Sequence, residues 1–293
     1  MVALRVGLVG AGPWAKLFHG PMVTGGPETE LVAVWARRAD AAQELASDLG
    51  SKAVDSYDEL LDQVDAVVFA VPPDAQADYA IKAAEAGKAL LLEKPLGLSL
   101  KRAEEVADAV NASGVVNQIM FTNRYTDHVR AFLAEASSRT PIGAMANFIN
   151  GACLPGGTFA TPWRIELGAI LDLGPHVFDL LDAAVGPIAE IRAAGDPRRW
   201  VAVTAEHENG AVSQAGLSLN STVQSDVTDV RLFTEQGELS TSFVAADTGP
   251  NTPGTIRSEF AAAVASGTPH ELDVNRALYL QRLIDQAARS LTN

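Results

Sequence analysis

The sequence predicts an α/β chain with an N-terminal doubly wound parallel sheet and a C-terminal α+β domain that contains a largely antiparallel, open-faced sheet. Three observations predict this fold. A glycine loop directly follows the first apolar run, apolar runs then alternate with helical segments, and strands of alternating polarity fill the second half. The change in character near Phe121 predicts two domains, residues 1–121 and residues 122–293.

The first apolar run, Leu4–Val9, stops at residues 10–15, which read GAGPWA. Gly10 suits a tight turn, and Gly12 has no Cβ to keep a pyrophosphate away from the backbone. The small Ala15 lets the next helix pack close to its strand. Glycines after a strand can also serve only as a turn, but this position predicts a dinucleotide-binding loop in a Rossmann-type domain. The candidate cofactor-binding residues of the loop are Gly10, Gly12, Pro13, Trp14 and Ala15.

Residues 31–120 continue with the alternation that is typical of βαβ units. Apolar runs of strand length bracket segments that carry Ala, Glu, Lys and Leu at helical spacing, and Gly50, Gly87 and Gly114 end those segments. Near-continuous apolar strands between helices indicate a parallel sheet that is covered on both faces. We expect strands at 31–35, 66–71, 89–92 and 115–120 and helices at 39–49, 75–86 and 100–113.

Beyond residue 121, a helical stretch at 125–136 precedes several expected strands. Apolar and polar residues alternate along them, as is typical of antiparallel strands. Segments 208–210 and 235–237 resemble hairpin turns. A sheet with one face covered by helices leaves its other face for a partner, so we expect a homo-oligomer, either a dimer or a tetramer. The expected strands are 144–150, 188–194, 200–207, 211–220, 227–234 and 239–243.

Composition and charge exclude several classes of protein. The 293 residues, of which 47% are hydrophobic and 20% charged, can bury a sizeable core. The formal net charge of -14 comes with no basic patch, so nucleic acid and anionic membrane surfaces are poor partners. Cys153 has no cysteine partner, no signal segment precedes the first strand, and no apolar run reaches the roughly 20 residues of a membrane helix. We therefore expect a cytoplasmic protein.

The end of the second expected strand indicates which dinucleotide is bound. An NAD-binding domain normally places a carboxylate there for the ribose 2′-hydroxyl. Ala36 removes that acceptor, and Arg37 and Arg38 offer planar donors that match a phosphate group. The alternative is a solvated arginine pair at a helix start, where cations are slightly unfavourable. We favour NADP as the cofactor, with NAD as the alternative, and Arg37 and Arg38 as its ligands.

Lys94 lies in the triplet Glu93-Lys94-Pro95, which follows the expected strand 89–92 at the carboxyl edge of the sheet. Open α/β folds bind ligands at this edge. A lysine here can stabilise a developing alkoxide or orient a substrate hydroxyl. A surface lysine paired with Glu93 is the alternative. No lysine follows Lys101 in the sequence, so Lys94 is the only lysine at a strand's carboxyl edge beyond the phosphate loop.

A further group of polar residues lies in segment 168–179. In a helix, Asp172 and His176 lie one turn apart on one face, and Asp179 is three residues further on. A histidine beside a carboxylate suits a general base, because imidazole titrates near neutrality and the carboxylate orients the ring. Pro175 would clash with a carbonyl one turn earlier in a straight helix, so we expect a kink or a helix start there. A capping Asp172 and a packed His176 explain the spacing equally well.

Together these motifs resemble the glucose-fructose oxidoreductase, inositol dehydrogenase and MocA family (Gfo/Idh/MocA) of dehydrogenases, and the resemblance covers almost the whole chain. Their order and spacing make it more specific than any one motif. The matching segments are 10–15, 72–73, 86–88, 93–95, 123–125, 142–143, 163–164, 172–179 and 273–277.

The resemblance implies an NAD(P)-dependent oxidoreductase that transfers a hydride between nicotinamide and a small-molecule substrate, namely a sugar, polyol or related hydroxy or carbonyl compound. Lys94, Asp172 and His176 would correspond to the active-site trio of the family. His176 would take the hydroxyl proton, and the other two residues would position the oxygen. The resemblance further implies contacts to the cofactor and to the substrate. The cofactor contacts are Pro72, Glu93, Lys94, Trp163 and Arg164, and the substrate contacts are Asn123, Arg124, Asp172 and His176.

Two functions of other classes stay open. The first is a sensor or scaffold of the same fold that binds nucleotide without turnover, and the intact trio argues against it. The second is a glycosidase that uses a tightly held NAD for transient oxidation, and Arg37 and Arg38 argue mildly against it.

The chain departs from the family pattern in several places. Gln76 stands where the family commonly has a histidine that can titrate, and residues 165–169 replace a longer glycine-rich stretch. The chain is also shorter than many relatives in its second domain. We expect these departures to affect the substrate. The five histidines are scattered without metal-ligand spacing, so we expect no metal site, and we interpret His19 as a packing or surface residue.

Overall fold

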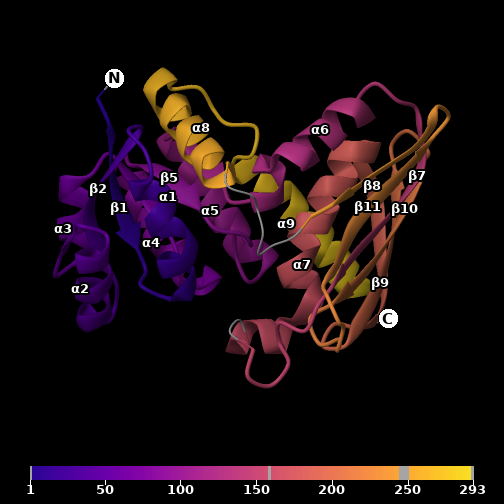
Figure 1. The fold of residues 1–293 in the computed structure, drawn as a ribbon, viewed down its shortest axis with the longest axis horizontal. Coiled ribbons are helices and arrows are strands. Elements are labelled where there is room, and N and C mark those ends of the chain that lie inside the picture. Colours follow the sequence, from indigo (N-terminus) through magenta and orange to yellow (C-terminus); the bar gives the residue numbers. More distant parts are fainter. Residues whose placement is uncertain (1, 158–159, 244–250, 292–293) are drawn as a thin grey trace. The chain divides into compact units, whose positions relative to one another are not determined.

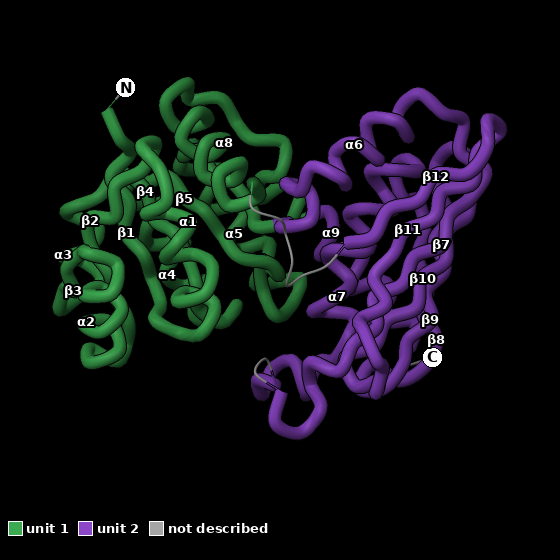
Figure 2. The backbone as a smooth tube through the Cα atoms, in the orientation of Figure 1, with its two compact units in different colours: residues 1–120, 250–278 green, residues 121–249, 279–293 purple. Residues whose placement is uncertain are grey.

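The computed structural model describes residues 2–157, 160–243 and 251–291 (Figure 1). The chain divides into two compact units (Figure 2). Unit 1 comprises residues 1–120 and 250–278, and unit 2 comprises residues 121–249 and 279–293. The segment 250–278, which the sequence analysis assigns to the second domain, thus packs with the first half of the chain.

Unit 1 contains the predicted parallel sheet, whose six strands follow the order β3-β2-β1-β4-β5-β6. All described pairings within it are parallel. The strand order reverses between β1 and β4, so the carboxyl ends of these two strands form the switch point at which such folds bind ligands. The strands are β1 (Leu4–Val9), β2 (Thr29–Trp35), β3 (Lys52–Ala53), β4 (Ala66–Phe69), β5 (Ala89–Leu92) and β6 (Asn117–Ile119).

Helices surround this sheet, and polar caps set several of their ends. The Ser56 side chain accepts the Glu59 N–H, the Ser99 side chain accepts the Arg102 N–H, and Gly114 ends its helix with a φ of 67°. The predicted helices are confirmed, whereas the short α3 and β3 were missed. The helices of unit 1 are η1 (Ala15–His19, a π-helix), α1 (Gly20–Thr24), α2 (Ala39–Asp48), α3 (Tyr57–Gln63), α4 (Pro73–Glu85), α5 (Leu100–Ser113) and α8 (Thr252–Ser266).

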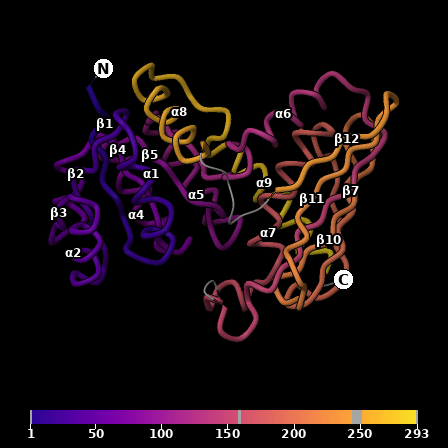
Figure 3. Tube along the Cα trace, viewed as in Figure 1, coloured from indigo at the N-terminus to yellow at the C-terminus, as the bar shows by residue number. Residues whose placement is uncertain are grey.

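The late segment of unit 1 is fastened to the last strand of the sheet. The Ile119 N–H donates to the Leu272 carbonyl at 2.7 Å, and the Val274 N–H donates to Asn117 Oδ1 at 2.8 Å. Figure 3, coloured along the chain, shows α8 beside elements from the first half. The first bond satisfies a backbone N–H of β6, where the parallel sheet ends, and the second satisfies the backbone N–H of Val274. Helix α9 (Val274–Ser290) starts directly after this attachment.

Unit 2 contains a six-stranded sheet of order β12-β11-β7-β10-β9-β8. Its pairs are antiparallel except β7 with β10, which is parallel. The predicted, largely antiparallel sheet is therefore confirmed. The strands are β7 (Pro141–Ile149), β8 (Ile188–Asp196), β9 (Trp200–His207), β10 (Val212–Ser218), β11 (Val227–Thr234) and β12 (Gly237–Ser242).

Helix α7 (Pro162–Val185) packs on one face of this sheet, against β7, β9, β10 and β11. Inward side chains such as Ala146, Val203 and Leu217 are buried, and their strand neighbours alternate outward. Unit 2 also contains η2 (Thr122–Tyr125), α6 (Asp127–Ala136) and the part of α9 from Tyr279 onward. Across the described residues, no helix combines the length and the apolar character needed to cross a membrane.

Helix α7 is broken at Gly168 and not at Pro175, where the sequence predicted the kink or start. Gly168 has φ 74° and ψ -162°, which only glycine adopts readily, and a Cβ there would lie 2.1 Å from the Pro197 carbonyl oxygen. That oxygen accepts the Ala169 N–H at 2.8 Å, so the turn between β8 and β9 supports the start of the second helical part. Pro175 lies inside this part, where the backbone stays helical.

Candidate active site

The phosphate loop leaves the end of β1 with its two glycines in different surroundings. Gly10 has φ 117°, and a Cβ there would meet the Ala70 carbonyl oxygen at 2.3 Å. A Cβ on Gly12 would meet no heavy atom within 4 Å. Gly10 is therefore required by the close passage of β4, and Gly12 keeps open a space that a phosphate can fill.

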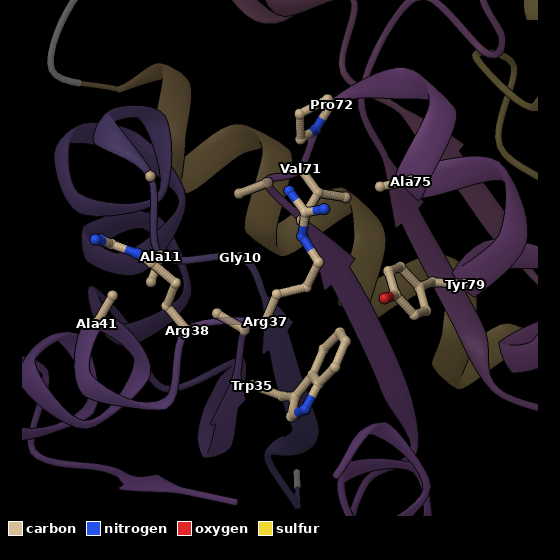
Figure 4. Close-up of a pocket in the computed structure, with 13 residues that line it drawn as sticks. Gly10, Ala11, Trp35, Arg37, Arg38, Ala41, Val71, Pro72, Ala75 and Tyr79 are labelled. Atoms are coloured by element: carbon tan, nitrogen blue, oxygen red, sulfur yellow. The ribbon is translucent and has the colours of Figure 1, made fainter. Parts of the chain in front are cut away.

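A cavity of about 230 Å³ opens beside this loop at the carboxyl ends of β1, β2 and β4 (Figure 4). It brings together the predicted residues Gly10, Gly12, Arg37, Arg38 and Pro72. In Figure 4, the Arg37 guanidinium extends toward Val71 and Pro72, and Arg38 extends toward Ala11. None of the described residues that line the cavity is acidic. The lining therefore suits a nucleotide group that carries phosphate, and it attracts negative charge.

Two aromatic side chains that the sequence analysis did not single out, Trp35 and Tyr79, also line this cavity. Their ring centroids are 4.9 Å apart with an interplanar angle of 74°. Tyr57 packs behind both, and its hydroxyl donates to the Tyr79 carbonyl at 2.7 Å. Burial strongly raises the pKa of Tyr57. These rings give the cavity a rigid apolar wall suited to a flat heterocycle.

Glu93 and Lys94 follow β5 and are both half-buried. The Glu93 carboxylate accepts the Trp14 indole N–H at 2.7 Å and the Lys94 backbone N–H at 3.2 Å. Gln76 donates its amide to the Glu93 carbonyl at 2.7 Å and accepts the Glu93 N–H at 2.8 Å. Glutamine here thus forms two hydrogen bonds that fix the backbone next to Lys94.

In unit 2, Asp172 and His176 are buried on the second part of α7, one helical turn apart. The Arg164 Nε donates to Asp172 Oδ2 at 3.0 Å, and the Arg164 guanidinium lies 4.5 Å from the ring centroid of Trp163. Burial raises the pKa of the Cys153 thiol, and the Asp172 carboxylate raises it further. The site therefore contains the buried Asp172 carboxylate, which Arg164 holds, and the buried imidazole of His176 one helical turn away.

Asn123 and Arg124 differ in their surroundings within unit 2. Arg124 Nη1 donates to both carboxylate oxygens of Asp179, at 3.1 and 3.2 Å. Asn123 is buried, and neither polar atom of its side chain has a hydrogen-bond partner among the described residues. Such an amide costs free energy unless something satisfies it, so Asn123 is suited to bind a ligand. The described residues contain no group of three or more His, Cys, Asp and Glu side chains that could hold a metal ion.

Comparison with known proteins identifies the family. Residues 4–121 match the model of the GFO_IDH_MocA group, described as an oxidoreductase family with an NAD-binding Rossmann fold. The match lies within the N-terminal Rossmann domain. The family predicted from the sequence motifs is thereby confirmed, together with its NAD-binding Rossmann fold.

Several curated relatives are dehydrogenases or reductases by name. The scyllo-inositol 2-dehydrogenase (NAD(+)) of Bacillus subtilis is 28% identical over 218 residues, 72% of this chain and 62% of that protein. The inositol 2-dehydrogenase of Rhizobium meliloti is 33% identical over 132 residues, 44% of this chain and 39% of that protein. The chain covers between 52% and 62% of the first three curated relatives it matches.

Solved structures share the fold over nearly the whole chain. GenD2 from gentamicin A biosynthesis, in complex with NAD, is 23% identical with a TM-score of 0.87, covering 100% of this chain and 95% of that chain. The scyllo-inositol dehydrogenase from Lactobacillus casei, with NAD(H) and scyllo-inositol, is 15% identical with a TM-score of 0.86, covering 99% and 97%. The predicted fold class is confirmed by these matches.

Proposed function

We propose that the chain is an NAD(P)-dependent oxidoreductase that transfers a hydride between nicotinamide and a sugar, a polyol or a related hydroxy or carbonyl compound. The observation that carries this proposal is the buried pair of Asp172 and His176 on α7, in a chain whose other unit is an NAD-binding Rossmann domain. Relatives named as acting on inositols, deoxysugar nucleotides and a sugar phosphate support this substrate class.

In the direction of oxidation, His176 accepts the proton of the substrate hydroxyl while the bound nicotinamide supplies the hydride acceptor. Lys94 and Asp172 position the substrate oxygen, and the Lys94 ammonium stabilises negative charge that develops there. Arg164 keeps the Asp172 carboxylate in place. Other contacts to cofactor or substrate come from Trp163, Asn123 and Arg124.

NADP is the preferred cofactor in this proposal. Ala36 offers no acceptor for a ribose 2′-hydroxyl, and Arg37 and Arg38 line the cavity without a neighbouring carboxylate among its described lining residues. A 2′-phosphate there gains charge-assisted hydrogen bonds, whereas NAD gains none of them.

The test is a fluorescence titration of the purified protein with NADPH and NADH. We expect NADPH to bind more tightly, and the Arg37→Ala/Arg38→Ala variant to bind NADPH about 10- to 100-fold more weakly with little change for NADH. Lys52→Ala/Lys101→Ala removes the same charge from exposed positions outside the cavity and serves as the control. Tighter NADH binding would overturn the preference and favour the glycosidase alternative.

A substrate screen then tests hydride transfer itself. The protein is incubated with each cofactor and a panel of polyols, sugars and carbonyl compounds while nicotinamide absorbance is followed. Nucleotide binding without turnover on any compound would favour the sensor or scaffold. Glycoside hydrolysis that requires NAD and releases no reduced cofactor would favour the glycosidase.

We further propose that the chain forms a homo-oligomer through the outer face of the sheet in unit 2. Met145, Trp200 and Val212 point to this face and keep 50%, 46% and 45% of their surface exposed. Val227 and Phe233 lie on the same face. Large apolar side chains gathered on one uncovered sheet face are typical of a surface that a second copy covers.

Two acidic substitutions on this face, Met145→Glu and Val212→Glu, are expected to give a monomer when combined, because each would bury a charge in the interface. Light scattering after gel filtration measures the mass, with a dimer or tetramer expected for the unaltered chain. Val223→Glu, at an exposed position between β10 and β11, should leave the assembly intact. An unaltered chain that is already monomeric would contradict the proposed interface.

A further inference from the structure

The Glu93 carboxylate links the phosphate loop to Lys94 and also contacts a third residue, His19. Oε1 accepts the Trp14 indole N–H and also lies 2.7 Å from His19 Nε2, while Oε2 accepts the Lys94 backbone N–H. Gln76 holds the backbone of the same glutamate from the other side. Trp14, His19, Glu93 and Lys94 thus form one connected network within unit 1.

The π-helix η1 lets Trp14 and His19 meet at one oxygen atom. The Gly20 N–H donates to the Ala15 carbonyl, a bond that spans five residues in place of four. In an α-helix, side chains five residues apart point about 140° away from each other around the axis. In a π turn, the hydrogen bond joins residues five apart, so side chains five residues apart point toward the same face. An α-helix does the same for side chains four residues apart. The π turn therefore serves the shared contact with Glu93.

Packing alone does not explain a histidine at position 19. The side chain is fully buried, and its Nδ1 has no hydrogen-bond partner among the described residues. An apolar side chain of similar size would avoid the cost of that unsatisfied atom. His19 also contacts the stacked pair of Trp14 and Phe18 through edge-to-face packing, which an apolar residue would largely preserve. The contact that requires a nitrogen is the one to Glu93.

We propose that His19 is a positioning residue for Lys94 and acts through Glu93 together with Trp14. The two donors fix the carboxylate, the carboxylate fixes the Lys94 backbone, and the lysine is thereby held relative to the loop that carries the cofactor phosphates. This inference rests on the proposed function only in giving Lys94 a role toward the substrate. The network itself can be tested without any substrate.

The experiment compares His19→Leu, His19→Gln and Trp14→Phe by hydrogen–deuterium exchange and by steady-state kinetics. We expect His19→Leu to speed exchange of the Glu93 and Lys94 amides about tenfold and to lower kcat about tenfold, with the NADPH Kd and the substrate KM nearly unchanged. His19→Gln keeps an N–H donor and should restore both readouts. Trp14→Phe keeps an aromatic ring but loses one donor to Glu93. Its exchange rates and kcat should lie between those of His19→Leu and His19→Gln.

Leu45→Ala is the control for general destabilisation, since Leu45 is a buried residue of α2, which packs against β2 and β3 and away from β5. Unchanged exchange and kcat in His19→Leu, or equal changes in Leu45→Ala, would overturn the inference. If the unaltered protein shows no turnover on any compound, the proposed function fails, and the exchange comparison still decides whether His19 holds the Glu93-Lys94 backbone. If turnover is normal in every variant, the proposed function stands and the inference fails.

Discussion

His176→Asn is expected to lower kcat for substrate oxidation by about 10²- to 10⁴-fold while leaving the Kd for NADPH almost unchanged. Asparagine fills a similar volume and can form hydrogen bonds, but its amide cannot accept a proton at neutral pH. His176 is buried on α7 in unit 2, whereas the described dinucleotide cavity lies in unit 1. Loss of the base should therefore affect the proton transfer and spare cofactor binding.

The measurement combines steady-state kinetics across pH with the fluorescence titration. In the unaltered protein, the oxidation rate should fall at low pH, where a protonated imidazole cannot act as a base. The residual rate of His176→Asn should lack that fall. His128→Asn, at an exposed position on α6, is the matched control and should behave as the unaltered protein does. Near-normal turnover in His176→Asn would make the assignment of the base wrong.

Gly168→Ala is expected to reduce the free energy of unfolding by about 2–5 kcal/mol, from a strained backbone and from a clash with the Pro197 carbonyl. The new Cβ would have to displace either the turn between β8 and β9 or the start of the second part of α7. Asp172 and His176 follow on that part, so we expect kcat to fall about 100-fold as well. Urea denaturation measures the stability change, and the substrate assay measures kcat.

Gly210→Ala separates the two causes. Gly210 has φ 85°, but a Cβ there would meet no atom within 4 Å, so this variant should lose only about 1–2 kcal/mol and keep its activity. Equal losses in the two variants would show that backbone strain, and not the contact with Pro197, determines the effect at Gly168.

Much of the fold could be predicted from the sequence because the parallel strands are continuous apolar runs. Strands such as β4 and β5 are buried on both faces, so each of their residues contributes to the signal. Strand β3 has two residues and α3 has seven, which is too short for a periodic pattern to appear. The attachment of residues 250–278 to unit 1 includes the bond from the Ile119 N–H to the Leu272 carbonyl and the ion pair of Arg257 with Glu28, and no local pattern encodes contacts between residues so far apart in the sequence.

In the candidate site, too, some features could be predicted from the sequence and others could not. The glycine loop and the arginine pair could be named from the sequence because both follow strands that are easy to recognise. The sequence predicts a break in α7 at Pro175 because a proline clashes with the carbonyl one turn earlier in a straight helix, but the positive φ of Gly168 depends on the distant turn at Pro197. His19 was interpreted as a packing or surface residue, since its contact with Glu93 arises from a π turn that has no sequence signature.

Unit 1 is built from two segments that are separated in the sequence by most of unit 2, so its parts are synthesised at different times. Residues 1–120 leave the ribosome before the partners of Asn117 and Ile119, which lie near residues 272–274 and emerge only after the whole sheet of unit 2. Until then, the nascent chain carries a nearly complete parallel sheet whose last strand lacks its covering segment. An uncovered strand edge of this kind invites pairing with other chains. We therefore expect the chain to be most prone to aggregation midway through translation, after β6 has formed and before residues 272–274 can cover it.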